Sequence, residues 1–437
     1  MATPIIGIRR EDINRWERRA PLTPREVEHL TRREGLSFVV QPSDLRVFKA
    51  EDYARAGAVV AEDLAAAGVV FAVKEIPLER LMAEKVYVFF SHVIKGQPAN
   101  MPMLKRMMEL GCSLIDYERV VDVKGRRLLF FGRYAGLAGM IDAAWALAQR
   151  LKLEGIDTPL AGLKPAYQYD DLAEAQGDGQ DVGERIKREG VGPGLAPLVV
   201  GITGYGNVSQ GAQEALAVMP VEELAAEELA EFFEAGEWSD KTLYKVVFRE
   251  EHLVEPAAAG GRFDLQEYYD HPDRYRSIFA RYLPYLTLLV NAVYWDERYP
   301  RLVTKGILRD LYAGGQPRLR VISDVSCDLG GSVEVTCKGT SPDAPVYCYD
   351  LDKDDVVDGF AGRGPVIYSV YNLPAELPRD ASAYFGARLL PYVREIARAD
   401  WERGFATCGL PDEIRGAVIL YRGELTPPYR YLERYLK

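Results

Sequence analysis

Two ionisable side chains end two apolar runs of the N-terminal third and could together move protons. Lys74 lies near the end of VVFAVKE, and His92 ends KVYVFFSH. Ligands meet side chains at the carboxyl ends of strands in an α/β sheet, so we expect both groups at one sheet edge. A histidine transfers protons near neutral pH, and a partly desolvated lysine beside another cation acts as a base or polarises a carbonyl. By position alone, an ordinary hydrogen-bonded histidine is the commoner interpretation of His92.

Arginine side chains could bind the carboxylates of a small substrate. Arg18 and Arg19 precede a helix start in WERRAPLTP, and Arg126 and Arg127 lie in the turn before RLLFFG. A guanidinium group forms two parallel hydrogen bonds with a carboxylate, so several such groups suit a substrate with more than one carboxylate. The alternative is that these are surface arginines.

A glycine turn in VVGITGYGNVSQG predicts a dinucleotide site. Gly204 and Gly206 lie between an apolar strand and the helix pattern SQGAQEALAVM. Glycine lets the backbone bend and approach a pyrophosphate, while a helix N-terminus offers free N–H groups to the anion. Ser209 replaces the third glycine of this fingerprint, and Gly211 follows two residues later. A purely structural turn is the alternative.

The rest of a dinucleotide site is less defined. An acidic residue about twenty positions further on would hold the ribose 2′-hydroxyl, and Glu222 or Glu223 could serve or could be a solvated helix charge. The choice between NAD and NADP therefore stays open, with Glu223 as our candidate. Asp324, after RVIS, could orient a base or the nicotinamide ring, or could equally cap a turn. Further expected cofactor contacts are Asn207, Val208, Ser209, Asn291, Ala292, Ser323 and Val325.

The elements that must position these residues alternate between strand and helix patterns. Apolar runs such as VVFAVKE, KVYVFFSH, CSLIDYE and RLLFFG alternate with helical patterns in the first third, which predicts an α/β fold. The segment LAGMIDAAWALAQRLKLEG is predicted to be a long helix that bridges two domains. The polar, glycine-rich stretch 169–194 is interpreted as a surface connection before the buried strand of the second domain. A chain of 437 residues favours two domains.

Composition restricts the class of partner. The net charge of −11 and the lack of a Lys/Arg block argue against nucleic acid and anionic membranes, which leaves a small molecule. Five cysteines without a CxxC pair indicate neither a disulfide framework nor a metal site. Because no run approaches about 18 uncharged apolar residues, we expect a cytoplasmic protein.

Several long blocks in one order resemble a known family. They are RREDINRWERRAPLTP, FAVKEIP, FFSHVIKGQPAN, LIDYERVVD, GRRLLFFGRYAGLAGMID, GITGYGNVSQGAQ and SDVSCDLGGSVE. Together they resemble the lysine-2-oxoglutarate reductase half of the aminoadipic semialdehyde synthases. More distantly, the chain is similar to lysine-forming saccharopine dehydrogenase and alanine dehydrogenase. The resemblance implies two Rossmann-like domains with a cleft between them: a discontinuous substrate domain at 1–138 and 326–437, and a dinucleotide-binding domain at 139–325.

The resemblance also implies a reaction and its residues. The reaction is reduction by NADPH or NADH of the imine between L-lysine and 2-oxoglutarate, which gives saccharopine in lysine degradation. Lys74 and His92 become the acid/base pair, and Asp324 is expected near the nicotinamide. The implied substrate contacts are Arg19, Gln97, Arg126, Arg127 and Phe131. The animal and plant enzymes imply NADPH, whereas Glu222 or Glu223 suits NADH.

Two other functions stay open at this point. One is a reductive aminase of the same scaffold that uses another amine or 2-oxo acid. The other is a non-catalytic module that senses nucleotide or lysine. Since the chain ends at residue 437, we expect it to lack the glutamate-forming half of the bifunctional enzymes. Saccharopine would then be released or passed to a separate glutamate-forming saccharopine dehydrogenase. A modulating role of Cys327, close to Asp324, is also open.

Overall fold

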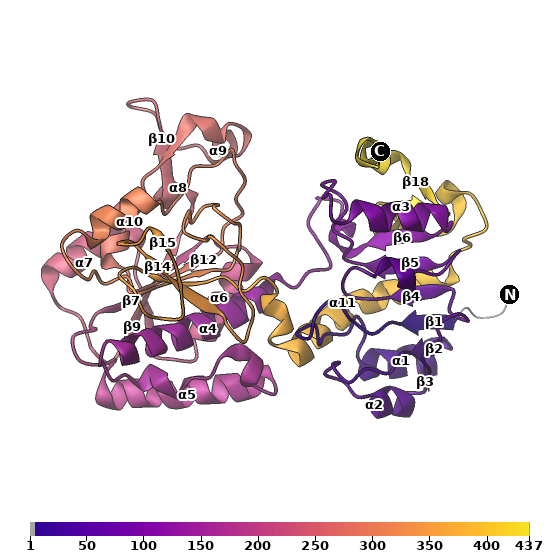
Figure 1. Ribbon diagram of the computed structural model, residues 1–437, viewed down its shortest axis with the longest axis horizontal. Helices are drawn as coiled ribbons and strands as arrows, with labels where there is room; N and C mark the ends of the chain where they lie inside the picture. The colour runs from indigo at the N-terminus through magenta and orange to yellow at the C-terminus, as the bar shows by residue number, and fades with distance from the viewer. Residues whose placement is uncertain (1–4, 437) are drawn as a thin grey trace. The chain divides into compact units, whose positions relative to one another are not determined.

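The chain folds into two α/β units in a computed structural model that describes residues 5–436 (Figure 1). The first unit contains the described residues up to Phe131 and those from Pro378 onward, and the second contains Gly132–Leu377. The α/β class and the discontinuous first unit agree with expectation. The boundaries differ, because residues 326–377, expected in the first domain, add strands to the sheet of the second unit.

The first unit is built on a sheet of eight strands in the order β18-β17-β6-β5-β4-β1-β2-β3. Strands β1 to β6 are parallel, whereas β17 runs antiparallel to β6 and β18 antiparallel to β17. The C-terminal segment therefore completes the sheet. The bounds are β1 Ile5–Ile8, β2 Ser37–Val40, β3 Val59–Val60, β4 Val69–Phe71, β5 Val86–Phe89, β6 Ser113–Asp116, β17 Val418–Tyr421 and β18 Glu424–Leu425.

The helices of this unit begin and end where local chemistry favours it. Helix α1 starts after Thr23 with a capping box and Pro24 in its first turn, and ends at Gly35 in the left-handed conformation. The apolar run RLLFFG, by contrast, contributes only an isolated bridge at Arg127. The bounds are α1 Pro24–Glu34, α2 Ala50–Arg55, α3 Met101–Glu109, α11 Pro378–Arg398 and α12 Asp412–Arg415, with a 3-10 helix η11 at Pro427–Tyr435.

The second unit contains an eight-stranded sheet in the order β15-β14-β16-β13-β12-β7-β9-β8. Strand β14 runs antiparallel to its two neighbours β15 and β16, whereas the other neighbouring strands pair in parallel, and β9 lies between β7 and β8. A separate antiparallel pair joins β10 to β11. The bounds are β7 Leu198–Thr203, β8 Val221–Glu223, β9 Leu243–Phe248, β10 Val254–Pro256, β11 Tyr275–Ser277, β12 Leu288–Asn291, β13 Val321–Asp324, β14 Val346–Asp350, β15 Asp355–Asp358 and β16 Val366–Tyr368.

One helix of the second unit was not expected. The stretch 169–194, interpreted as a surface connection, contains the 18-residue helix α5, whose first turn is capped by Asp171. Apolar and small residues recur along one buried face of this helix, and Gly183 packs closely against Met219 and Pro220. Tertiary packing therefore outweighs the low helix propensity of glycine. The bounds are α4 Gly132–Leu153, α5 Leu172–Glu189, α6 Asn207–Leu216, α7 Leu229–Ala235, α8 Glu250–Leu253, α9 Leu265–Asp270 and α10 Lys305–Tyr312.

Helix α4, predicted to bridge two domains, belongs wholly to the second unit. Within residues 5–436 no helix combines the length and the apolar character needed to cross a membrane. Over the same residues, no group of His, Cys, Asp and Glu side chains could hold a metal ion.

Candidate active site

A buried carboxylate fixes the backbone around Lys74, just past the end of β4. Glu11 Oε1 accepts the N–H of Val73 at 2.7 Å, and Glu11 Oε2 accepts the N–H of Lys74 at 3.0 Å. Burial, followed by the charge of Glu17, raises the pKa of Glu11 to about 7. The backbone at Lys74 is thus held by a side chain from the segment that follows β1.

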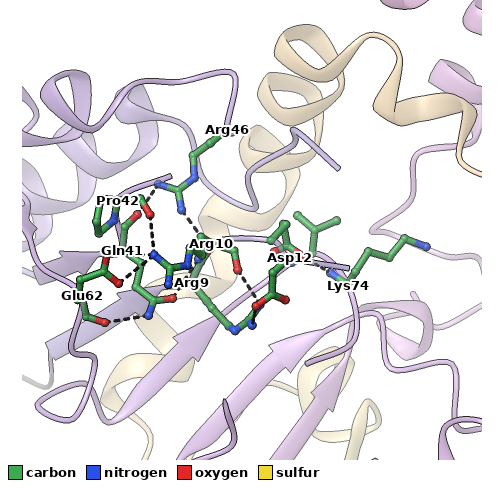
Figure 2. A network of polar contacts seen from close by, with 10 residues as sticks. Arg9, Arg10, Asp12, Gln41, Pro42, Arg46, Glu62 and Lys74 are labelled. Carbon is green, nitrogen blue, oxygen red and sulfur yellow. Dashed lines mark hydrogen bonds and ion pairs between the residues drawn. The ribbon is translucent and has the colours of Figure 1, made fainter. Parts of the chain in front are cut away.

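Arginine side chains in turn hold the segment that contains Glu11 (Figure 2). Arg46 donates to the carbonyl of Arg9 at 3.2 Å, and Arg9 is ion-paired with Asp12 at 2.5 Å. Arg10 is ion-paired with Glu62 at 2.9 Å. The Lys74 side chain points away from this network in Figure 2, so the network supports the site without binding the ammonium group.

The Lys74 ammonium group is suited to proton transfer. Burial, and then the positive charge of Arg19, lower the pKa of Lys74, while Glu75 and Glu17 oppose this effect. Among residues 5–436, no hydrogen bond or ion pair involves its Nζ atom. The amine is therefore available to a substrate and loses its proton at lower pH than an ordinary lysine.

His92 and Glu75 form a directed pair. His92 Nδ1 lies 2.5 Å from Glu75 Oε1, and Asn100 Nδ2 donates to the His92 carbonyl at 3.1 Å. Burial disfavours ionised Glu75, but the hydrogen bond and the charge of His92 outweigh it and lower the pKa of Glu75. An ionised Glu75 accepts from Nδ1–H, which leaves Nε2 as the nitrogen that exchanges protons.

The backbone at His92 is held in place from two sides. The residue has a φ of 49°, in the left-handed region that non-glycine residues rarely adopt. Its neighbour Ser91 donates through N–H and O–H to the buried carboxylate of Asp116, whose pKa burial raises to about 6. Tyr431, in η11, donates to the carbonyl of Ile94 at 2.6 Å. The C-terminal segment therefore helps to position the histidine loop.

Arg19 is buried beside Lys74 and already ion-paired. Its Nε and Nη2 atoms lie 2.8 and 2.6 Å from the two oxygens of Glu17. Its guanidinium lies 4.2 Å above the centre of the Phe131 ring, which stacks on Phe385 of α11 with ring centres 4.5 Å apart. The structure thus gathers Arg19, Phe131, Lys74 and His92 in the first unit.

The other expected substrate contacts are less clearly part of this group. Arg126 and Arg127 are exposed and ion-paired locally, with Asp122 at 2.7 Å and with Glu118. Nothing in these contacts links them to Lys74. Gln97 is half-buried, and its Oε1 atom is buried without a hydrogen-bond partner among the described residues.

Three adjacent strand ends in the second unit are tied together by side chains. Thr203 of β7, Asn291 of β12 and Asp324 of β13 are in register. Thr203 Oγ1 donates to Asn291 Oδ1 at 2.8 Å, and Asn291 Nδ2 donates to Asp324 Oδ1 at 2.8 Å. Asn291, an expected cofactor contact, is therefore buried and occupied in holding the carboxyl edge of the sheet.

Asp324 is fully buried, and both of its oxygens are occupied. Oδ1 also accepts from Ser326 at 2.8 Å, and Oδ2 accepts from Thr336 at 2.5 Å. Burial raises the pKa of Asp324 in spite of these hydrogen bonds. Such a carboxylate orients its neighbours and is a poor candidate for a freely exchanging base. Burial also raises the pKa of Cys327 to about 12, so that thiol is poorly ionised.

The remaining expected contacts lie around this edge. Ser323 Oγ donates to the carbonyl of Gly139 in α4 at 3.1 Å. The backbone N–H of Ala292 donates to Thr203 Oγ1, and that of Val325 donates to the carbonyl of Asn291. Ala292 and Val325 thus contribute to this edge through backbone N–H groups, and Ser323 through its hydroxyl.

The glycine turn fits an anionic ligand. Gly204 has a φ of 79°, and a Cβ there would lie 3.2 Å from the carbonyl of Ala292, so the turn requires glycine. At Gly206 a Cβ would meet nothing within 4 Å, so the protein's own packing does not require glycine there. Asn207 and Val208 then begin α6. The open backbone beside a helix N-terminus suits a phosphate group.

The glycine missing at Ser209 has a counterpart in Gly211. Side-chain atoms on Gly211 would overlap the carbonyl of Arg133, and on Gly136 they would overlap that of Val208, so α6 and α4 pack backbone to backbone. Ser209 is buried and accepts from Gln213 at 3.1 Å. The close packing of α6 on α4 therefore depends on Gly211, two positions after the place where the fingerprint has its third glycine.

The structure does not bring Glu223 to the glycine turn. Glu223 lies on the edge strand β8 and is ion-paired with Lys245 of β9 at 2.7 Å. Strand β9 separates it from β7. The residue that follows the end of β9 is Arg249, which the sequence reasoning missed. The run KVVF before it was a usable signal, but only with β9 placed beside β7.

Fold and site together define a class of protein. Sequence models of the N-terminal and C-terminal domains of alanine dehydrogenase/PNT match residues 7–138 and 273–428, well over half of the chain. The chain belongs to this family of nicotinamide-nucleotide-dependent dehydrogenases.

Particular relatives are similar over nearly the whole chain. Alpha-aminoadipic semialdehyde synthase of Rattus norvegicus is 37% identical over 99% of this chain and 48% of its own length. The Arabidopsis thaliana protein of the same name is 36% identical over 99% of this chain and 42% of its own length. The chain thus spans about half the length of these curated relatives. Saccharopine dehydrogenase [NAD(+), L-lysine-forming] of Neurospora crassa is 28% identical over 92% of this chain and 93% of its own length.

Solved structures agree on the fold. L-alanine dehydrogenase matches with a TM-score of 0.62 and 21% identity over 99% of this chain and 100% of its own. A transhydrogenase from Sinorhizobium meliloti matches with a TM-score of 0.57 and 14% identity over 97% of this chain and 99% of its own. These likenesses support the two-domain Rossmann-like architecture alone.

Proposed function

We propose that this chain reduces the imine formed from L-lysine and 2-oxoglutarate to saccharopine, as a lysine-2-oxoglutarate reductase in lysine degradation. The observation that supports this most is 36–37% identity over nearly the whole chain to aminoadipic semialdehyde synthases. It is joined by a lysine of lowered pKa close to the His92–Glu75 pair. The first unit would bind the substrates, and the second would bind the nucleotide at its glycine turn.

Each proton step has a suitable group in the first unit. The lysine ε-amine must lose a proton before it attacks the 2-oxoglutarate carbonyl, and Lys74, with its lowered pKa, can accept one. Loss of water to the imine requires a proton on the leaving oxygen, which His92 can supply from Nε2 while Glu75 holds Nδ1. The nucleotide, when bound, supplies the hydride.

The three carboxylates of saccharopine need cationic partners. Arg19 is the buried candidate, and its ion pair with Glu17 would have to share or exchange its hydrogen bonds with the ligand. Arg126 and Arg127 are exposed candidates that would leave Asp122 and Glu118. Substrate contacts through Gln97 and Phe131, and a place for Asp324 near the nicotinamide, belong to the same proposal.

Cofactor, partner and compartment complete the proposal. We assign NADPH as the reductant, with NADH as the alternative, and contacts to it around Gly204 and Gly206. A separate glutamate-forming saccharopine dehydrogenase would consume the product. We place the protein in the cytoplasm; because the rat and mouse relatives are named as mitochondrial, cell fractionation is the test.

The test is oxidation of NADPH and of NADH, followed by absorbance, with lysine and 2-oxoglutarate together and with each omitted in turn. Oxidation that needs both substrates, with saccharopine as the product by mass spectrometry, is the expected result. Oxidation that needs another amine or oxo acid would indicate a different reductive aminase. No oxidation with any pair would contradict a reductase.

A further inference from the structure

The order of strands in the second unit decides which residue lies beside the glycine turn. Strand β9 pairs in parallel with β7, with Phe248 opposite Thr203, and the N–H of Gly204 donates to the carbonyl of Phe248 at 2.8 Å. Glu223, the last residue of β8, pairs with Lys245, before β9 ends. The first residue beyond the strand that borders the turn is therefore Arg249.

The side chain of Arg249 is directed toward the turn. Its guanidinium carbon lies 5.2 Å from the ring centre of Tyr205, which stands between Gly204 and Gly206. The side chain is exposed, and no described residue forms an ion pair with it. Lys245 on the same strand is neutralised by Glu223 at 2.7 Å. Arg249 is thus a cation without a counter-charge at the glycine turn.

Two carboxylates close to Arg249 in the structure contact other groups. Glu227 Oε1 lies 2.8 Å from His252 Nε2, and the His252 ring accepts the N–H of Arg249 at 3.0 Å. Glu250 Oε1 accepts from the hydroxyl of Tyr269 at 2.7 Å, while its other oxygen is buried without a hydrogen-bond partner among the described residues. Glu250, which directly follows Arg249, is therefore the carboxylate that we test as an alternative partner of the ribose.

We propose that Arg249 binds the 2′-phosphate of the adenine ribose and makes the protein prefer NADPH to NADH. The assignment rests on the proposed function, because it requires a nicotinamide nucleotide at the glycine turn. At this sheet position an acidic side chain holds a free ribose 2′-hydroxyl, whereas an arginine accommodates a 2′-phosphate. The guanidinium fork matches two phosphate oxygens, and its stacking on Tyr205 limits the freedom lost on binding.

The test is a set of binding titrations that need no turnover. Wild type, Arg249→Ala and Arg249→Lys are titrated with NADPH and NADH by nucleotide fluorescence. Adenosine 2′,5′-bisphosphate and adenosine 5′-monophosphate are then used as competitors. Arg262→Ala, which removes an exposed arginine of the loop after β10, is the matched control.

The expected result is a loss confined to ligands with a 2′-phosphate. Arg249→Ala should weaken NADPH and the bisphosphate about tenfold to a hundredfold, and Arg249→Lys less. Binding of NADH and the monophosphate should stay within about twofold, which also shows that the variants fold. Arg262→Ala should match the wild type.

Three results would overturn the assignment, and they differ in what they imply for the proposed function. Equal wild-type affinity for NADPH and NADH, unchanged in Arg249→Ala, would remove Arg249 from the site while leaving the proposed reductase in place. The same holds if Glu250→Gln weakens NADH and Arg249→Ala alters nothing, because Glu250 would then hold the ribose. Failure of the wild type to bind either nucleotide would overturn the proposed function along with it.

Discussion

His92 Nδ1 lies 2.5 Å from an oxygen of Glu75, and Glu75 directly follows Lys74 in the chain. Two consecutive residues beyond β4 therefore supply a proton-transfer group and the carboxylate that holds its partner. A carboxylate in this position keeps a histidine in one tautomer and one ring orientation.

Glu75→Gln should separate two effects of Glu75 on His92: the orientation of the imidazole ring and the stabilisation of its positive charge. The amide oxygen can still accept from Nδ1–H, but it does not stabilise a charged imidazole, so we expect a loss of kcat of about tenfold to a hundredfold. Glu75→Ala should lower kcat further, because no side chain then accepts a hydrogen bond from Nδ1–H of His92. Steady-state rates over a pH series are the measurement, and wild-type kcat and pH profile in both variants would contradict a positioning role.

Lys74→Met should remove proton transfer while leaving nucleotide binding intact. The thioether has a similar length but cannot exchange a proton, so we expect kcat to fall about 10²- to 10⁴-fold. Stopped-flow turnover and nucleotide titration measure the two quantities separately. Lys95→Met, at an exposed lysine, is the control and should keep its rate. A rate for Lys74→Met within a few fold of wild type would refute the assignment.

Arg19→Gln should move the pH profile of turnover to higher pH. The charge of Arg19 lowers the pKa of Lys74, second only to burial; without it the protonated lysine is less disfavoured and its pKa rises. The limb of the kcat profile that reports deprotonation of Lys74 should shift in the alkaline direction. Arg18→Gln, at the half-buried neighbour, should leave that limb in place. A shift to lower pH in Arg19→Gln would show that Arg19 does not act on Lys74 in this way.

Glu11 should make the protein less stable as pH rises. Its pKa is raised from 4.5 to about 7, so the folded state holds the proton more tightly than the unfolded state. The stabilisation is complete below pH 4.5 and is lost as pH approaches 7, with a slope of up to about 1.4 kcal/mol per pH unit. Urea unfolding of wild type and Glu11→Gln across this range measures the difference. Glu79→Gln, at an exposed carboxylate, should keep the wild-type slope; identical slopes in Glu11→Gln and wild type would count against the raised pKa.

Gly136→Ala should damage the second unit through the contact between α4 and α6. The added methyl group would overlap the carbonyl of Val208 at the start of α6, so we expect a loss of about 2 kcal/mol or more in unfolding free energy. Nucleotide binding should weaken too, because α6 follows the glycine turn. Gly177→Ala in α5, where a Cβ meets nothing within 4 Å, should be neutral or stabilising by up to about 1 kcal/mol. Equal stability of the two variants would argue against backbone contact at Gly136.

Neighbouring residues in the sequence were enough to predict the helices and strands that carry the site residues. The capped start of α1, the strand before Gly204 and the strands before Lys74 and His92 were predictable, since each depends on neighbouring residues. The α/β class follows from the same alternation. Helix α5 was missed because its polar, glycine-rich composition hides a face that is apolar only when packed.

Only the tertiary structure decided which of these residues meet. Hydrogen bonding between distant segments places β9 between β7 and β8, which puts Arg249 at the glycine turn and Glu223 away from it. It also assigns residues 326–377 to the second unit. The spacing of residues in the sequence does not reveal such pairings. Long connections separate the paired strands of a parallel sheet, so strands that are neighbours in the chain need not be neighbours in the sheet. The sequence by itself determined which groups could do the chemistry, and the sheet order determined their neighbours.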